Sequence, residues 1–104
     1  MQREREFQRA VVELARLCGW RVFHARPALN QRGRWLTPIQ GDARFPDLVL
    51  VRPPRVLFAE LKRAGGRLTA AQRGWLEALR ACAGVECYLW TPKEWEAILH
   101  TLKR

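Results

Sequence analysis

Residues 44–63, RFPDLVLVRPPRVLFAELKR, contain two runs of branched apolar residues on either side of Pro53-Pro54. Each run has the length and composition of a β-strand, so residues 48–51 and 56–59 are predicted to form a hairpin. If the turn is centred between the two prolines, the numbers of paired residues add to 107. Two-residue hairpin turns need a positive φ, so a four-residue loop over 52–55 is expected, with the same register.

Three charged residues stand in this hairpin: Asp47, Glu60 and Lys62. The register places Asp47 opposite Glu60, and directly opposed residues have Cβ atoms about 4.5–5.5 Å apart. Lys62 lies two residues beyond Glu60, so its side chain emerges on the same face. Two carboxylates so placed repel each other unless one keeps a proton or a divalent cation binds both. The alternative from spacing alone is a surface ion pair of Lys62 with one acid.

The rest of the chain is predicted from its apolar periodicity and its capping signals. An α/β fold follows, with a mixed central sheet flanked by helices in one domain over 1–104, and with central strands buried on both faces. The predicted elements are a helix over 2–18, a strand over 20–25, a long loop over 26–44, the hairpin, a helix over 68–83, a strand over 85–90, and a last helix after the capping box of Thr91 and Glu94.

The composition indicates a nucleic-acid partner. The chain has 104 residues with 19 Lys+Arg against 10 Asp+Glu, a net charge of +9, and most of the basic residues are arginine. The planar guanidinium suits phosphate, and a small domain this basic binds polyanions through counterion release. No apolar run approaches the roughly 20 residues of a membrane helix, so we expect a cytoplasmic protein without a membrane partner. Its three cysteines show no metal-ligand spacing and are expected to be free and packed.

Hard oxygen ligands, a lysine and a basic surface together favour hydrolysis of phosphodiester bonds. A divalent metal would polarise the scissile phosphate and lower the pKa of a water, and Lys62 would stabilise the attacking hydroxide or the developing charge.

Several motifs carry a resemblance to known nucleases. Pro46-Asp47 followed by Glu60-Leu61-Lys62 resembles the PD-(D/E)xK signature of restriction-endonuclease-like enzymes. With Glu4-x-x-x-Gln8, the FPDLVLV and FAELK strands, and GRLTAAQ over 66–72, the chain resembles the VRR-NUC (virus-type replication-repair nuclease) family in its stand-alone form. The resemblance implies a restriction-endonuclease-like fold and a Mg²⁺- or Mn²⁺-dependent DNA endonuclease acting on branched, flapped or junction DNA in replication, repair or recombination. We expect a homodimer, since one small domain covers little DNA.

The resemblance also implies roles for single residues. Asp47, Glu60 and the Leu61 carbonyl would bind the metal, and Lys62 would be the catalytic lysine. The N-terminal acid of the family maps to Glu4.

Three features leave alternatives open. Glu6 is the reserve for Glu4, and either acid is equally explained as a charge favoured by the helix dipole. Gln72 would lie near the metal by resemblance, yet it also completes a capping box with Thr69. Arg44 stands where family members commonly have glycine, with Gly41 three residues earlier. The candidate phosphate contacts are equally explained as solvated charges: Arg34, Arg44, Arg63, Arg67 and Arg73.

Two other functions remain open. The first is a nucleic-acid-binding module that keeps the nuclease fold without cleaving, although all three signature residues are present. The second is a restriction-like enzyme with a specific site, for which 104 residues leave little room. The apolar residues late in the chain either close the core or form a dimer interface: Trp90, Trp95, Ile98 and Leu99.

Overall fold

The computed structural model describes residues 4–24, 28–29, 31–36 and 40–104. Its main sheet has the strand order β1-β4-β5-β6, in which β1, β4 and β5 are antiparallel and β6 runs parallel to β5. This is the predicted α/β fold with a mixed sheet. The bounds are α1 Glu4–Leu17, β1 Arg21–His24, β4 Leu48–Arg52, β5 Arg55–Leu61, α2 Ala70–Arg80, β6 Glu86–Trp90 and α3 Trp95–Lys103.

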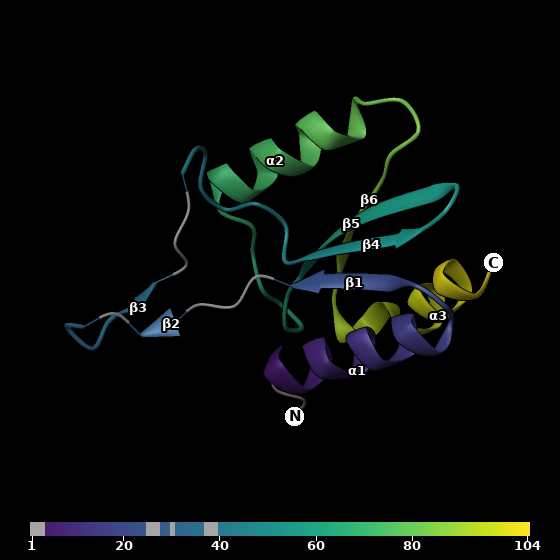
Figure 1. Cartoon of the computed structure of the whole chain (residues 1–104), viewed down its shortest axis with the longest axis horizontal. Coiled ribbons are helices and arrows are strands. Elements are labelled where there is room, and N and C mark those ends of the chain that lie inside the picture. The colour runs from purple at the N-terminus through teal and green to yellow at the C-terminus, as the bar shows by residue number, and fades with distance from the viewer. Residues whose placement is uncertain (1–3, 25–27, 30, 37–39) are drawn as a thin grey trace.

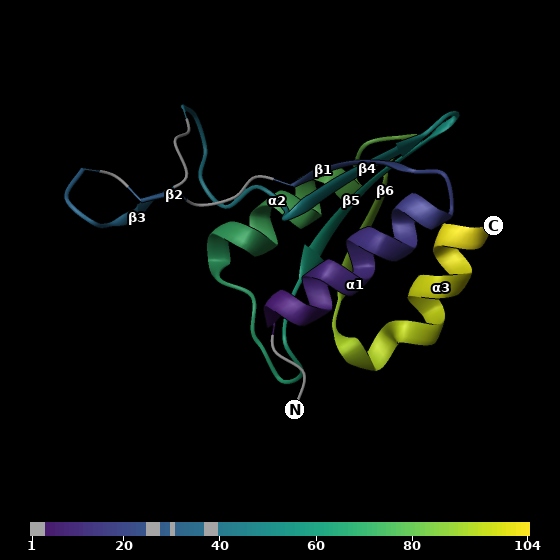
Figure 2. The ribbon, with the colours of Figure 1, turned by 60° about the horizontal axis from the view of Figure 1, so that its bottom comes forward.

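The helices lie on both faces of this sheet. α1 and α3 lie side by side on one face, and α2 lies on the other (Figures 1 and 2). α2 connects β5 to the parallel strand β6, so it serves as the crossover that a parallel pair requires. None of the described helices combines the length and the apolar character needed to cross a membrane.

The segment 26–44 differs from the prediction of an unstructured loop. Two short strands, β2 (Ala28–Leu29) and β3 (Trp35–Leu36), pair as a separate antiparallel sheet that stands away from the main body (Figure 1). The predicted element order therefore lacks two strands. Strands of two residues show no measurable alternation, so periodicity could not find them. The rest of this predicted loop lies partly outside the described residues, as do residues 2–3 of the first predicted helix and residue 25 of the first predicted strand.

The central hairpin has the predicted register. Its pairs run from Leu48 with Ala59 to Arg52 with Arg55, and each pair of numbers adds to 107. The predicted four-residue loop is wrong, because Arg52 and Arg55 are themselves strand partners. The peptide between the two prolines is cis, and neither proline has a positive φ.

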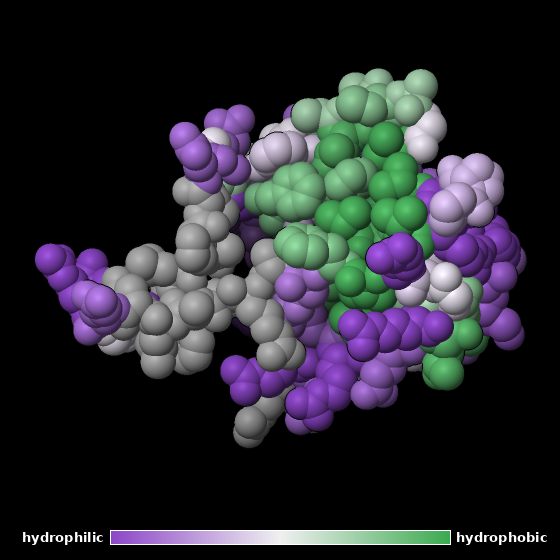
Figure 3. Space-filling model, viewed as in Figure 1, coloured by the Kyte–Doolittle hydropathy of each residue, from purple (hydrophilic) through white to green (hydrophobic). Residues whose placement is uncertain are grey.

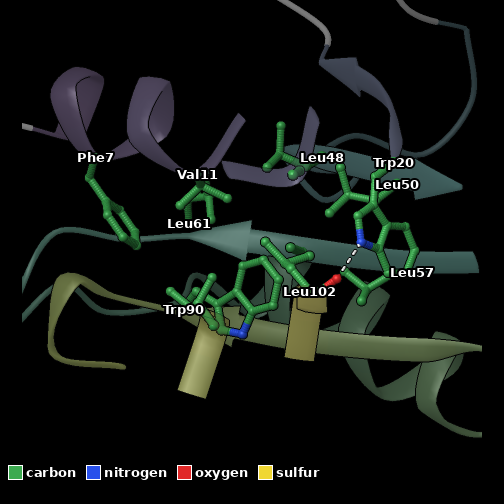
Figure 4. Packing of buried hydrophobic residues seen from close by; sticks show 12 residues of the cluster. Phe7, Val11, Trp20, Leu48, Leu50, Leu57, Leu61, Trp90 and Leu102 are labelled. Atoms are coloured by element: carbon green, nitrogen blue, oxygen red, sulfur yellow. Dashed lines mark hydrogen bonds between the residues drawn. The ribbon is translucent and has the colours of Figure 1, made fainter. Parts of the chain in front are cut away.

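The core lies between the sheet and the α1 and α3 side. Phe7 and Val11 of α1 pack toward Leu61, and the alternate residues of the hairpin strands complete the cluster (Figure 4). Leu48, Leu50, Leu57, Ala59 and Leu61 are fully buried, as period-2 alternation requires.

The prediction that the central strands are buried on both faces is wrong for the face opposite the core. Val49, Val51, Val56 and Phe58 are only partly buried, and apolar residues gather on this side of the surface (Figure 3). α2 packs mainly on β6, so a single short helix leaves part of β4 and β5 uncovered.

Arginines of the hairpin turn connect the C-terminal ends of α1 and α3. The Arg52 guanidinium donates to the carbonyl oxygens of Cys18 at 2.7 Å and of Leu102 at 2.9 Å. The indole of Trp20 donates to the same Leu102 oxygen at 2.9 Å (Figure 4). Arg52 and Arg55 both lie over the Trp20 ring, at 4.5 and 4.8 Å from its centroid. These two arginines therefore bond to carbonyl groups at helix ends, so their guanidinium groups serve the fold.

Both predicted capping boxes are present, at Thr69 with Gln72 and at Thr91 with Glu94. After Thr91 the chain first forms a 3₁₀ turn, Pro92–Glu94, and then enters α3. α2 is shorter than the predicted 68–83, because its cap is Thr69 and its last residue is Arg80. All three cysteines are free, but Cys82 is exposed, since it follows the end of α2 and no longer lies on its apolar side.

Candidate active site

Asp47 and Glu60 meet at the open end of the hairpin, as the pairing sum predicts. The two carboxyl groups are close enough for Asp47 to act on the pKa of Glu60 through hydrogen bonding and charge, and Glu60 is only 2% exposed. The backbone N–H of Leu61 donates to Asp47 Oδ2 at 2.8 Å, which fixes the Asp47 carboxylate at the start of β4. Strand pairing thus brings two acids together at a buried position.

This environment changes the ionisation of Glu60. Burial is the largest cause, followed by the hydrogen bond and the negative charge of Asp47, and together they raise the pKa of Glu60 to about 9. The positive charge of Lys62 lowers that pKa in part, and the charge of Glu4 raises it further. The carboxyl pair therefore holds one proton at neutral pH when no cation is bound.

Lys62 follows β5 directly and is partly buried. Its backbone N–H donates to the carbonyl of Trp90 at 2.9 Å, so the parallel pairing with β6 continues to this residue. The chain then turns back at Gly66, whose N–H donates to the Arg63 carbonyl at 2.9 Å. A Cβ on Gly66 would lie 3.0 Å from the Arg63 oxygen and 3.3 Å from the Lys62 Cβ. The glycine permits this close approach beside the lysine.

The two N-terminal acids differ in their relation to the carboxyl pair. Glu4 and Glu6 are both exposed in the first turn of α1, but only Glu4 acts on the pKa of Glu60. Among the described residues, no three His, Cys, Asp or Glu side chains are grouped so that they could hold a metal ion together. The charge of Glu4 thus acts on the pair.

Gln72 closes the first turn of α2 and is 9% exposed. Its Oε1 accepts from the Thr69 N–H at 2.9 Å, and its own N–H donates to Thr69 Oγ1 at 3.1 Å. The capping interpretation is therefore confirmed. The second interpretation, a role beside the metal, stays a prediction.

The backbone at Arg44 has a conformation that favours glycine, the residue that the resemblance leads one to expect at this position. Arg44 has φ 72, in the left-handed region that favours glycine, and its side chain is exposed. Sequence reasoning missed the aromatic cluster that follows it. The Phe45 ring contacts Phe58 and Trp75 edge to face, with centroids 5.7 and 4.9 Å apart. The available signal was an aromatic residue directly before Pro46-Asp47.

The other candidate DNA contacts are all exposed: Arg34, Arg63, Arg67 and Arg73. Arg34 belongs to the segment between β2 and β3, away from the main sheet (Figure 1). Arg63 and Arg67 flank the turn after Lys62, and Arg73 lies in the first half of α2. Exposure suits phosphate contact and solvation equally, so these roles stay predictions.

The late apolar residues serve the core. Trp90 and Ile98 belong to the buried cluster, and Trp95 packs against it, while Leu99 is partly buried. Closing the core is therefore confirmed for Trp90, Trp95 and Ile98, and the homodimer stays a prediction.

Comparison with known families gave one match. The model described as the VRR-NUC domain matches residues 21–91, a range that contains Asp47, Glu60, Lys62 and Gln72 but not α1. Comparisons with curated proteins and with solved structures found no match.

Proposed function

Because the chain belongs to the VRR-NUC domain family, we propose that it is a Mg²⁺- or Mn²⁺-dependent endonuclease that cleaves branched, flapped or junction DNA. Membership of the family implies a nuclease-type function with DNA as substrate. The observation that carries the finer proposal is the close approach of the Asp47 carboxyl to the buried Glu60 carboxyl, with Lys62 acting on the same group. A structural ion pair would not need two acids in contact at a buried position.

The carboxyl pair fits a divalent cation. One proton is held between two oxygen ligands, and Mg²⁺ and Mn²⁺ prefer carboxylate and carbonyl oxygens. The Leu61 N–H points to Asp47, and the N–H and C=O of one strand residue face the same neighbouring strand. The Leu61 carbonyl is therefore available on the side of the carboxylates. When bound, the metal would supply Lewis-acid polarisation of the scissile phosphate.

The side chains around the pair have separate tasks in this proposal. The Lys62 ammonium stabilises the attacking hydroxide or the negative charge that develops on the phosphate. Glu4 adds negative charge from α1, which strengthens the attraction of the pair for a positive charge. Gln72 holds the start of α2 in place through its bonds to Thr69.

The positive charge of the chain supports DNA as the polyanion. The net charge is +9, and the exposed arginines Arg44, Arg63, Arg67 and Arg73 lie on the segments that surround the pair or on α2. A protein that neutralises phosphates in this way binds more weakly as salt rises. A homodimer would let two such sites engage the two strands of one junction, and a role in replication, repair or recombination follows from such substrates.

The test is a cleavage panel. The protein is incubated with nicked, flapped, junction and linear duplex DNA in the presence of Mg²⁺, Mn²⁺ or EDTA, and the products are mapped. We expect cleavage of the branched substrates with metal and none with EDTA. Glu60→Gln is expected to remove cleavage, whereas Glu96→Gln, at an exposed acid of α3, is the matched control and keeps it.

Binding of the metal has a readout independent of turnover. A cation that binds only the folded state stabilises it by RT ln(1 + [L]/Kd), about 2.7 kcal/mol at 100 times Kd. The parent protein is therefore expected to melt at higher temperature with Mn²⁺, and Glu60→Gln is not. Metal-independent melting together with DNA binding and no cleavage would instead identify a non-catalytic DNA-binding module.

A further inference from the structure

Phe45 places an aromatic ring beside the candidate active site. The residue lies two positions before Asp47, and its ring contacts Phe58, which lies two positions before Glu60 on the same face of β5. Residues two apart on a strand are separated by about 6.6 Å. The ring of Phe45 and the carboxyl pair are therefore neighbours on one face of the sheet.

The ring is held in place and yet remains accessible. Its centroid lies 5.7 Å from that of Phe58 and 4.9 Å from that of Trp75, at interplanar angles of 87° and 85°. Trp75 is fixed in turn, because its Nε1 donates to the Ala43 carbonyl at 2.9 Å. Phe45 nevertheless keeps 42% of its surface exposed. A side chain with these contacts is preorganised, so binding a ligand costs it little entropy.

The backbone before the ring has an unfavourable conformation. Arg44, with φ 72, occupies a region that costs an L-residue free energy. Strain of this kind persists where the surrounding structure enforces it and is concentrated at functional sites. Here it sets the direction in which the chain enters Pro46-Asp47 and presents Phe45 at the surface.

A nucleobase matches this ring and its surroundings. Aromatic side chains stack on bases of any sequence, whereas bases inside a duplex already have neighbours on both faces. The Phe45 ring contacts Phe58, and Phe58 lies about 6.6 Å along β5 from Glu60, so a base stacked on Phe45 would belong to a nucleotide close to a phosphate held at the carboxyl pair. A base that is unpaired near the scissile phosphate has a free face for this ring, whereas a base inside the duplex does not.

We propose that Phe45 is a stacking platform for an unpaired base next to the cleaved phosphate, and that it thereby selects branched over fully paired DNA. The proposal rests on the proposed nuclease function for its substrate, and it adds the residue that determines specificity. Phe45 is a binding residue here, since the reacting atoms lie at the carboxyl pair and Lys62.

The experiment is a thermodynamic cycle on binding, measured in EDTA so that no cleavage is needed. Fluorescence anisotropy gives the Kd of flapped DNA with an intact strand and with single abasic sites placed one at a time around the branch point. For the parent protein, one abasic position is expected to weaken binding by about 5- to 150-fold, the range of one base–aromatic stack. Phe45→Ala is expected to bind intact DNA more weakly than the parent protein by the same factor. On the DNA with that abasic position, the variant and the parent are expected to bind with equal affinity.

Matched variants separate stacking from packing. Phe45→Leu keeps an apolar contact with Trp75 and Phe58, so it is expected to fold like the parent yet bind like Phe45→Ala, and Phe45→Trp is expected to restore affinity. Phe23, which is 62% exposed on the edge strand β1, supplies the control Phe23→Ala with unchanged binding. Fully paired DNA is expected to bind all variants equally.

Three results would overturn the proposal: wild-type affinity of Phe45→Leu, an abasic penalty that persists in Phe45→Ala, or an equal loss in Phe23→Ala. Its failure is distinguishable from failure of the nuclease function. If the protein cleaves DNA with metal but the cycle shows no coupling, the proposed nuclease function stands and the stacking proposal is wrong. If the cycle shows coupling but no DNA is cleaved, the base-binding role of the ring stands and the proposed nuclease function is wrong.

Discussion

Replacing Glu60 by glutamine is expected to stabilise the metal-free protein while it removes cleavage. In the fold the pKa of Glu60 is about 9, against an ordinary value of 4.5. Between these two values the folded state keeps a proton that the unfolded chain releases, so stability falls as pH rises. Below pH 4.5 the carboxyl is neutral in both states and this cost disappears. Glutamine is neutral at every pH, so a protein with glutamine at this position does not lose this stability as pH rises.

The magnitude follows from the interval between 4.5 and the working pH. At pH 7 that interval is about 2.5 units, and each unit corresponds to about 1.4 kcal/mol, so the upper limit is roughly 3 kcal/mol. The glutamine must still bury an amide opposite Asp47, although its N–H₂ can donate to that carboxylate. We therefore expect Glu60→Gln to raise the free energy of unfolding by about 1–3 kcal/mol at pH 7.

The assay is urea unfolding in EDTA at pH 5, 7 and 9, with parent and variant compared at each pH. The advantage of Glu60→Gln is expected to be small at pH 5 and to grow toward pH 9, while Glu96→Gln shows no such trend. Taking the difference between the two proteins removes other titrating groups. If Glu60→Gln is no more stable than the parent, or if its added stability shrinks as pH rises, the fold does not keep a proton on Glu60 and the reasoning is refuted.

The remaining predictions concern the loop, the cap and the ion pair. Arg44→Gly is expected to raise the free energy of unfolding by roughly 0.5–1 kcal/mol, because it relieves the left-handed backbone, while DNA affinity falls; a loss of stability in thermal unfolding would contradict this. Gln72→Ala is expected to cost about 0.5–1 kcal/mol and Gln72→Glu much less, since Glu also closes a capping box; equal losses in urea unfolding would argue against the cap. Bonds to Arg55 are the main cause that lowers the pKa of Glu86 to about 2, at N–O distances of 2.6 and 2.7 Å. The ion pair of Arg55 with Glu86 thus stabilises the fold fully above pH 4.5, and this stabilisation is lost as pH falls toward 2. Glu86→Gln is therefore expected to lower the free energy of unfolding by roughly 1–3 kcal/mol at pH 7 and not to change it near pH 2. A cost that is independent of pH in acid unfolding curves would exclude the ion pair as its source.

Several features followed from the sequence because they depend on short-range rules. The pairing of Asp47 with Glu60 required only a symmetric turn at the two prolines and the alternation of strand residues. The capping boxes at Thr69 and Thr91 required only residues three apart. In each case the partners are set by the chain itself, within one hairpin or one helical turn.

Other features depended on how distant elements pack. The charge of Glu4 acts on Glu60 because α1 begins beside the end of β5, and no spacing rule connects these residues. The conformation of Arg44 and the exposure of Phe45 arise where the loop meets α2 through Trp75. Sequence by itself determined which groups form the carboxyl pair. The tertiary structure decided how deeply that pair is buried and what lies around it, because burial and electrostatic environment are sums over neighbours from the whole chain.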